Sequence, residues 1–215
     1  DPELKDVILS GAFGSDYSLT DVLEILEGGQ FNTMDRTEHH VTRWDLIIAH
    51  PPCTYLTVAA NKYYNEDVYG EKARERKRLR EDAIGFFMAF VNADCDQIAI
   101  ENPVGVISTR YRKADQIIQP YQFGHPVSKK TCLWLKNLPL LKPTDIVEPE
   151  IIHSKGRTGG YSGPSWYVTD ENGKILAWND PRTARIRSKT YQGVADAIAE
   201  QWGSQRYYSQ MSLFE

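Results

Sequence analysis

The sequence predicts an α/β fold with a mostly parallel sheet and helices on both faces. The first observation is that apolar runs at 45–49, 97–100 and 131–135 have the composition of short buried strands. The second is that a helical pattern at 66–93 separates two of these runs, as is typical of such sheets. The third is the length of 215 residues, which suits one domain or one domain with a small appendage.

The elements follow in order along the chain. Residues 7–15 predict a strand and a GxxG turn, and residues 19–26 predict a helix. The strand at 45–49 ends at a His-Pro-Pro sequence, and the strand at 97–100 ends at a Glu-Asn-Pro sequence. The helical pattern at 66–93 begins with charged residues and ends with apolar ones.

The C-terminal third has a different composition. Residues 142–182 are rich in glycine and proline, and Asn172-Gly173 between two apolar runs predicts a hairpin. We interpret this part as a small irregular or β insertion. Residues 188–202 predict a further helix, and the last dozen residues predict a tail.

Composition and charge exclude several classes of protein. The net charge of −4 excludes a binder that works by bulk positive field, although a local basic patch is still compatible with nucleic acid. No segment approaches the roughly 20 apolar residues of a membrane span, and the acidic N-terminus predicts no signal peptide. Three cysteines in this length predict reduced thiols and a cytoplasmic protein. The spacing of cysteines and histidines predicts no metal site.

A candidate nucleophile and a candidate catalytic carboxylate each follow a predicted strand. Ligands of open α/β sheets bind at the carboxyl ends of strands, where the sequence places Cys53 and Glu101. The rigid Pro51-Pro52 turn would project Cys53 into the crevice as a nucleophile, although a lone cysteine is more often a small buried apolar residue. Glu101 at the mouth of a buried strand is either used there or caps a nearby helix.

Three short motifs occur in the same order along this chain as in a known enzyme family. The Pro-Pro-Cys sequence at 51–53, the Glu-Asn sequence at 101–102 and the Phe-Gly-His-Pro segment at 123–131 resemble three motifs of the cytosine-C5 DNA methyltransferases. Residues 44–136 resemble most the small phage and prophage members of that family. The resemblance implies a Rossmann-like S-adenosylmethionine-dependent methyltransferase fold.

The resemblance also implies roles for single residues. Cys53 would add to C6 of a flipped cytosine, which makes C5 able to attack a methyl group. Glu101 would hold the N3/N4 edge of the base and stabilise the charge that develops there. Thr131 stands where the family has its second motif arginine. The substrate-binding residues implied by the resemblance are Pro52, Asn102, Lys129 and Lys130.

The family takes its methyl group from S-adenosylmethionine. The GxxG turn at 10–15 is one candidate for its donor-binding motif. In the register that we prefer, Asp21 and Val22 resemble the later cofactor motif, and Asp6 is the acidic residue that ends the second strand. That register leads us to expect the first strand and the Gly-rich turn to lie upstream of Asp1.

The resemblance implies double-stranded DNA as the partner. Residues 72–80 carry six cations and one glutamate, a local charge of +5 that either contacts phosphates or is a solvated helix face. The candidate DNA-binding residues in it are Arg74, Arg76, Lys77 and Arg78. In the insertion, aromatic residues would either stack on DNA or form a small core of their own; they are Tyr161, Trp166, Tyr167 and Trp178.

These expectations divide the chain into functional parts. Residues 1–136 form a methyltransferase-like catalytic core, 137–182 a candidate target-recognition insertion, and 183–203 a helix that returns to the core. The tail at 204–215 contains Gln-Met-Ser-Leu-Phe, which resembles the peptide that docks on the bacterial sliding clamp. Its clamp-binding residues would be Gln210, Leu213 and Phe214.

Two other functions fit the same residues. One is a DNA-binding homologue without methylation activity, because the donor motif is not evident and Thr131 replaces an arginine. The other is an enzyme that modifies cytosine or another pyrimidine with a different one-carbon donor. The leading expectation is a DNA cytosine-C5 methyltransferase that acts in a bacterial or phage-infected cell.

Overall fold

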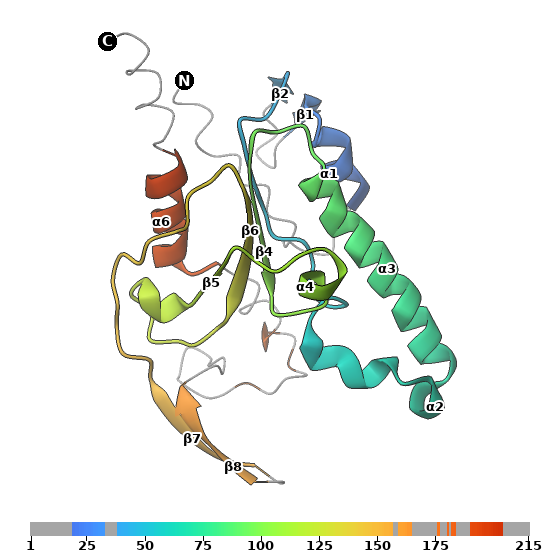
Figure 1. The fold of residues 1–215 in the computed structure, drawn as a ribbon, viewed down its shortest axis with the longest axis vertical. Helices are drawn as coiled ribbons and strands as arrows, with labels where there is room; N and C mark the ends of the chain where they lie inside the picture. The colour runs from blue at the N-terminus through green and yellow to red at the C-terminus, as the bar shows by residue number, and fades with distance from the viewer. Residues whose placement is uncertain are drawn as a thin grey trace. The chain divides into compact units, whose positions relative to one another are not determined.

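A computed structural model of the chain provides the structure (Figure 1). The residues that it describes are 19–32, 38–156, 159–164, 176, 180, 182–183 and 190–203. They form two compact units, each treated by itself below. The first comprises Asp1–Ile117 and Thr131–Pro139, and the second comprises Ile118–Lys130 and Leu140–Glu215.

The first unit contains most of the regular structure. Its helices are α1 (Leu19–Ile25), the 3₁₀ helix η2 (Val58–Tyr64), α2 (Glu66–Tyr69), α3 (Glu71–Val91) and α4 (Ile107–Arg110). Its strands are β1 (Gly29–Asn32), β2 (Glu38–Val41), β3 (Leu46–Ala49), β4 (Gln97–Pro103), β6 (Thr131–Lys136) and β5 (Gln116–Ile118), the last of which reaches the boundary between units. The apolar runs and the helix at 19–26 are confirmed as elements.

The main sheet has the strand order β3-β4-β6-β5 and is mixed. β3 and β4 are parallel, with Ala49 in register with Ile100, whereas β4 and β6 are antiparallel, with Asn102 in register with Cys132. The predicted mostly parallel, Rossmann-like sheet is therefore wrong, because only one pair of strands is parallel. A continuous apolar run indicates that a strand is buried on both faces, but it does not indicate whether the strand is parallel or antiparallel to its neighbours.

The predicted helix at 66–93 is two helices. Gly70 separates α2 from α3 and has a φ of +53°, which is outside the range of a right-handed helix. The Gly70 N–H donates to the carbonyl of Glu66 and closes α2, and α3 begins at the next residue.

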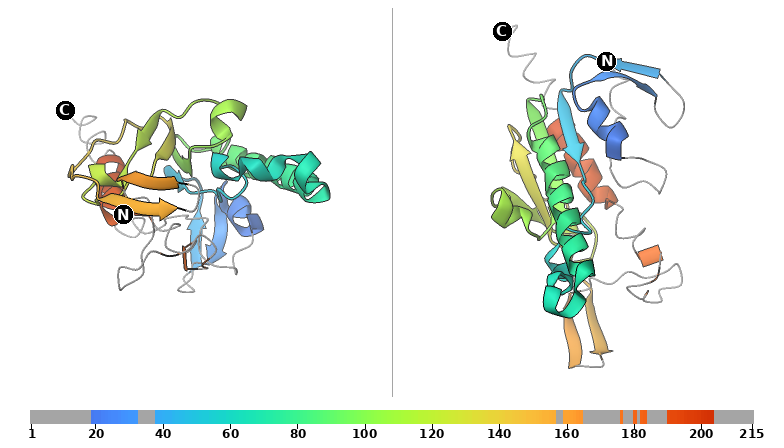
Figure 2. Two further views of the ribbon diagram at one scale, coloured as in Figure 1. Left: turned by 90° about the horizontal axis from the view of Figure 1, so that it is seen from below. Right: turned by 90° about the vertical axis from the view of Figure 1, so that its right-hand side faces the viewer.

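The core of the first unit lies between α3 and the sheet. The C-terminal half of α3 contributes Phe86, Phe87 and Phe90, all buried, and α3 runs along β4 (Figures 1 and 2). The ring of Phe87 meets the ring of Trp134 on β6 edge to face, with centroids 5.2 Å apart. In the charged N-terminal half of α3, Ala73 is buried, Arg76, Leu79 and Arg80 are half-buried, and the other residues are exposed, so the change in composition along this helix marks where it leaves the core.

A short hairpin precedes the sheet. β1 and β2 pair antiparallel after Gly28 and Gly29, whose φ angles of +89° and +108° make the turn out of α1. The indole N–H of Trp44 donates to the carbonyl of Ile25 at 2.6 Å and ties the end of α1 to the entry of β3. No pattern of apolar residues predicted these two strands, because they are largely exposed.

Among the described residues, the second unit contains fewer helices and strands than the first. It contains the 3₁₀ helix η3 (Pro120–Gln122), the antiparallel hairpin β7 (Ile151–Gly156) and β8 (Gly159–Pro164), and the helix α6 (Gln192–Gly203). The hairpin lies within the predicted insertion, whereas the hairpin predicted at Asn172-Gly173 and the strand and turn predicted at 7–15 lie outside the described residues. None of the helices described is both long and apolar enough to cross a membrane.

Candidate functional site

The parallel pair β3 and β4 brings the two predicted catalytic segments together. Ala49 is the last residue of β3 and is paired with Ile100 of β4, which continues to Pro103, so the next residues, His50 and Glu101, lie side by side. The Nδ1 atom of His50 lies 2.7 Å from Oε2 of Glu101. Both side chains are mostly buried, with 15% and 21% of their surface exposed. A partly buried, charge-assisted contact of this length is among the stronger hydrogen bonds in proteins.

Asn102, near the carboxyl end of β4, ties this strand to the Pro-Pro turn. Its Nδ2 donates to the carbonyl of Pro51 at 2.8 Å, and the residue is 1% exposed. Its Oδ1 is buried without a hydrogen-bond partner in the described part of the chain. Because Pro51 and Pro52 have fixed φ angles, this single bond is enough to set the direction in which the chain leaves β3.

The two segments continue side by side beyond the strand ends. The Val106 N–H donates to the carbonyl of Leu56 at 2.8 Å, and Thr57 forms a β-bridge with Gly105. A Cβ on Gly105 would lie 2.1 Å from the Leu56 carbonyl oxygen, so only glycine allows this approach. The segment that follows Cys53 is therefore fixed against the segment that follows Glu101.

Cys53 lies at the start of this segment and is exposed. Its carbonyl accepts hydrogen bonds from the N–H groups of Leu56 and Thr57, at 3.0 and 3.1 Å, which closes a turn directly after the Pro-Pro pair. Cys95 and Cys132 are buried, and burial raises the pKa of both thiols. Of the three cysteines, only Cys53 is placed to meet a solvent-borne substrate.

A cluster of tyrosine and arginine side chains holds the residues that follow Cys53. The Arg76 guanidinium lies 5.0 to 5.5 Å from the ring centroids of Tyr55, Tyr63 and Tyr64. Arg80 stacks on Tyr64 at 3.4 Å and donates to the Tyr55 carbonyl at 2.9 Å. Both arginines come from α3, so this helix anchors the segment.

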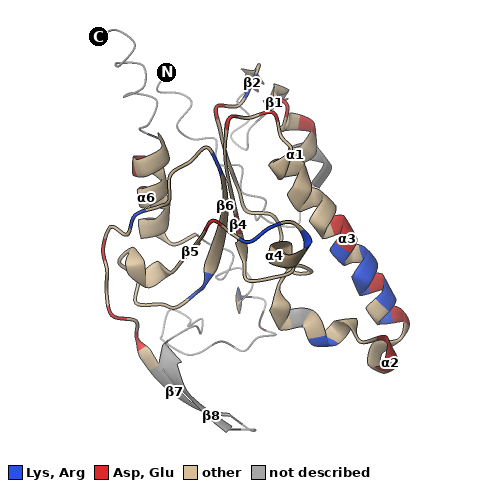
Figure 3. Ribbon diagram, viewed as in Figure 1, with Lys and Arg blue, Asp and Glu red and all other residues tan. Residues whose placement is uncertain are grey.

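The predicted DNA-binding cations of α3 lie in ion pairs or in this cluster. Basic and acidic residues alternate along this part of the helix (Figure 3). Arg76 belongs to the tyrosine cluster, whereas the other three pair with carboxylates. The ion pairs are Arg74 with Glu66 and Glu71, Lys77 with Glu66, and Arg78 with Glu75 and Asp82. Residues 66–82 carry six cations and six carboxylates, so the +5 segment is neutral in its wider surroundings. The paired side chains are largely exposed, and exposed ion pairs are weak enough for a phosphate to compete.

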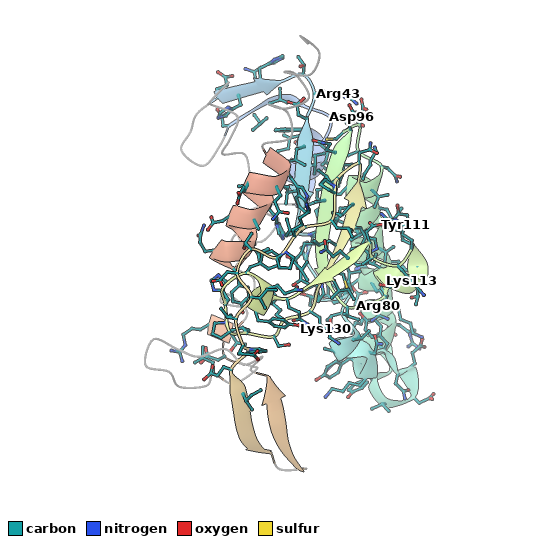
Figure 4. The ribbon with its side chains drawn as sticks, turned by 60° about the vertical axis from the view of Figure 1, so that its left-hand side comes forward. Arg43, Arg80, Asp96, Tyr111, Lys113 and Lys130 are labelled. Carbon is teal, nitrogen blue, oxygen red and sulfur yellow. The ribbon has the colours of Figure 1, made fainter. Side chains whose placement is uncertain are left out.

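The opposite end of the parallel pair carries a different set of charges. Arg43 precedes β3 and donates to Asp94 and Asp96, which precede β4, at 3.0 to 3.2 Å. Figure 4 labels Arg43 beside Asp96, and Arg80 apart from them on α3. These exposed ion pairs link the amino ends of β3 and β4. The other end of the pair has the mostly buried His50–Glu101 contact instead.

The predicted donor-binding residues are described only in part. Val22 lies on α1 and packs against the core, so its side chain is used in folding. The backbone of Asp21 lies in the same helix, and its side chain and all of Asp6 lie outside what the structure describes. Among the described residues, no group of three or more ionisable side chains is arranged to hold a metal ion.

The third motif belongs to the second unit. His125 Nε2 accepts a hydrogen bond from the Gly193 N–H at the start of α6, at 3.0 Å, and its ring packs on Tyr191. The Lys129 ammonium lies 5.9 Å from the centroid of the same Tyr191 ring. Lys130 is exposed. This motif is thus anchored on the N-terminal end of α6, a contact that the sequence did not predict.

Thr131 begins β6 and is buried. It is in register with Pro103, just beyond Asn102. A short hydroxyl side chain therefore packs where the motif resemblance implies an arginine. The predicted clamp-binding residues Gln210, Leu213 and Phe214 lie outside the described residues.

Comparisons with protein-family models and with curated proteins find no match for this chain. The motifs and the geometry around the carboxyl end of β3 are therefore the features that bear on function. Sequence reasoning identified Cys53 and Glu101 but did not identify His50 or Arg80 as part of this region. A histidine directly after a buried strand, beside a carboxylate on the next strand, was the available signal for His50.

Proposed function

We propose that this chain is a DNA cytosine-C5 methyltransferase of the small phage type, with Cys53 as nucleophile and Glu101 as its partner. One observation carries the proposal. The exposed Cys53 follows β3, Glu101 lies near the carboxyl end of the adjacent parallel strand β4, and the Asn102–Pro51 hydrogen bond fixes one segment against the other. A thiol and a carboxylate fixed in this way suit an attack on a planar base.

The chemistry requires these two groups to act together. The Cys53 thiolate forms a bond to C6 of the cytosine, and the electron pair of the C5=C6 bond moves toward C5 and the ring. As negative charge develops, N3 takes a proton from solvent, and the Glu101 carboxylate accepts hydrogen bonds from that N3–H and from the N4 amino group. C5 then donates its electron pair to an electrophile; loss of the C5 hydrogen as a proton, departure of the thiolate and release of the N3 proton restore the aromatic ring.

The base must be out of the duplex to meet both groups. The aromatic side chains Tyr63 and Tyr69 are exposed beside the basic helix, and Lys62 and Lys72 lie exposed near them in sequence. Together with Arg74, Lys77 and Arg78 they supply stacking and phosphate contacts for DNA.

S-adenosylmethionine would supply an electrophilic methyl group to C5. Val22 packs in the core and does not fit a cofactor contact, so the donor is proposed from the motif resemblance alone. In the same way, the tail at 204–215 is proposed to dock on the sliding clamp of a bacterial or phage-infected cell.

The proposal is tested with DNA that contains 5-fluorocytosine and with labelled S-adenosylmethionine. Fluorine at C5 cannot leave as a cation, so a methylated base stays bonded to the protein. We expect a stable adduct at Cys53 in the natural chain and none in Cys53→Ser. Stable DNA binding without methyl transfer would overturn the proposal and favour the homologue without activity.

A second measurement separates thiol addition from methyl transfer. Addition at C6 makes C5 basic, so C5 takes a deuteron from heavy water, and elimination leaves deuterium in place of the original hydrogen. This C5 hydrogen exchange needs no methyl donor. We expect exchange in the natural chain and none in Cys53→Ser.

A further inference from the structure

We propose that His50 is a positioning residue: its Nδ1–H group holds the Glu101 carboxylate in the orientation that meets the base. This inference rests on the proposed function and deepens it. It assigns a role to a side chain that neither the motifs nor the mechanism above uses.

The strand register is the first argument. Residues that follow a paired position on neighbouring parallel strands lie about 4.8 Å apart and project to the same side of the sheet. Ala49 is paired with Ile100, so His50 and Glu101 occupy such a position. The contact is therefore built into the sheet and does not depend on a flexible segment.

The chemistry of the two groups is the second argument. With Glu101 ionised, its carboxylate can only accept hydrogen bonds, so the 2.7 Å contact in that state requires a proton on His50 Nδ1. Both side chains are mostly buried, at 15% and 21% exposed, so water competes weakly for Oε2. With Oε2 held, rotation of the Glu101 carboxylate is restricted before the base arrives. Pre-orientation of this kind is what lets a carboxylate stabilise a developing charge.

The backbone next to His50 and the second ring nitrogen of His50 also favour this role. The Asn102–Pro51 bond fixes the backbone immediately after His50, so the Cα atoms that carry the imidazole and the carboxylate stay close together. The structure gives His50 Nε2 no hydrogen bond within the described part of the chain, so Nδ1 is the ring atom that is engaged. The role of His50 is thus to hold Glu101, and the role of Glu101 is to hold the base.

The test compares two substitutions at one position. Asparagine places an amide N–H close to where Nδ1 stands, whereas alanine removes the donor. We expect His50→Ala to lower the rate of C5 hydrogen exchange at saturating DNA about 10- to 100-fold, the range implied by a hydrogen bond to a charged group. We expect His50→Asn to restore most of that rate and both variants to bind DNA as the natural chain does. His40→Ala, an exposed position on β2, is the matched control and should keep the full rate.

Two results would overturn the inference. One is an unchanged rate in His50→Ala, and the other is a rate in His50→Asn no higher than in His50→Ala. Thiol titration of the buried Cys95 and Cys132 reports whether each variant is folded.

A nuclear magnetic resonance measurement keeps this inference separate from the proposed function. The ¹⁵N spectrum of the histidine rings should show His50 protonated at Nδ1 and should change in Glu101→Ala. A His50 ring protonated only at Nε2 would overturn the inference, even if the chain exchanges the C5 hydrogen. Absence of exchange in the natural chain, with the Nδ1–H form present, would overturn the proposed function and leave the His50–Glu101 contact established.

Discussion

At the residue scale, the three cysteines differ in the surroundings of their sulfur atoms. Burial raises the pKa of Cys95, whose Sγ donates to the Gln97 carbonyl at 3.1 Å. Burial also raises the pKa of Cys132, and the Glu101 carboxylate raises it further. Cys53 is exposed at a strand end. Because the fold desolvates two of these identical side chains, we expect the three thiols to differ in reactivity.

Alkylation should separate these thiols. In the folded chain at pH 7.5, iodoacetamide should modify Cys53 and leave Cys95 and Cys132 intact until denaturant is added, as peptide mass spectrometry would show.

Raised pKa values in the folded state mean that the stability from the protonated thiols is full below the ordinary thiol pKa, about 8.5. That contribution is lost as the pH rises through the raised values, so the melting temperature should fall above about pH 8.5. Equal iodoacetamide labelling of all three cysteines in the folded chain would contradict the burial of Cys95 and Cys132.

Asn102 carries a second prediction at this scale. Asn102→Ala removes the donor to Pro51 and leaves a buried carbonyl without that bond, which should lower the free energy of unfolding by about 1–3 kcal/mol. Chemical denaturation measures the difference. Asn92→Ala at the exposed end of α3 is the control and should stay within about 0.5 kcal/mol. A loss at position 102 no larger than that of the control would contradict the assigned bond.

At the scale of elements, the close approach of the two strand-end segments depends on Gly105. The added Cβ of Gly105→Ala would meet the Leu56 carbonyl oxygen at 2.1 Å, so the segments must separate. We expect a loss of about 1–3 kcal/mol in the free energy of unfolding and a large loss of C5 hydrogen exchange. Gly85→Ala on α3 is the matched control: a Cβ there meets nothing within 4 Å, and alanine should stabilise the helix by about 0.5–1 kcal/mol. Equal effects of the two substitutions would contradict this.

The ion pairs of α3 predict a response to acid. Hydrogen bonds and charge from Lys77 and Arg78 lower the pKa of Glu66 and Glu75, and Arg110 lowers that of Glu81. Lowered pKa values mean that this stability is present above the ordinary glutamate pKa and is lost as the pH falls through the folded-state values. The melting temperature should therefore decrease below about pH 4.3, and less so in 1 M salt, because these pairs are exposed. A melting temperature unaffected by acid would contradict a stabilising role for the pairs.

At the scale of the whole molecule, the sequence located elements better than their directions. β3, β4 and β6 stand where continuous apolar runs predicted strands. The direction of β6 was predicted wrongly because burial on both faces produces the same run in either direction. The hairpin β7–β8 was missed because Gly-Gly-Tyr-Ser-Gly-Pro lacks the alternation of a half-buried strand.

The candidate site was predictable only in part for a similar reason. Cys53 and Glu101 stand out because each follows a buried strand. The contacts that unite them, from His50 to Glu101 and from Asn102 to Pro51, join residues 51 positions apart. They depend on the parallel register of β3 and β4, which no local pattern specifies.

The most direct test of the account is the exchange of the cytosine C5 hydrogen in DNA incubated with the protein in heavy water. Mass spectrometry of the released nucleosides measures deuterium at C5, and no methyl donor is needed. The account predicts deuterium uptake with the natural chain and none with Cys53→Ser. Equal uptake with both chains, or none with the natural chain bound to DNA, would contradict the claim that Cys53 adds to cytosine.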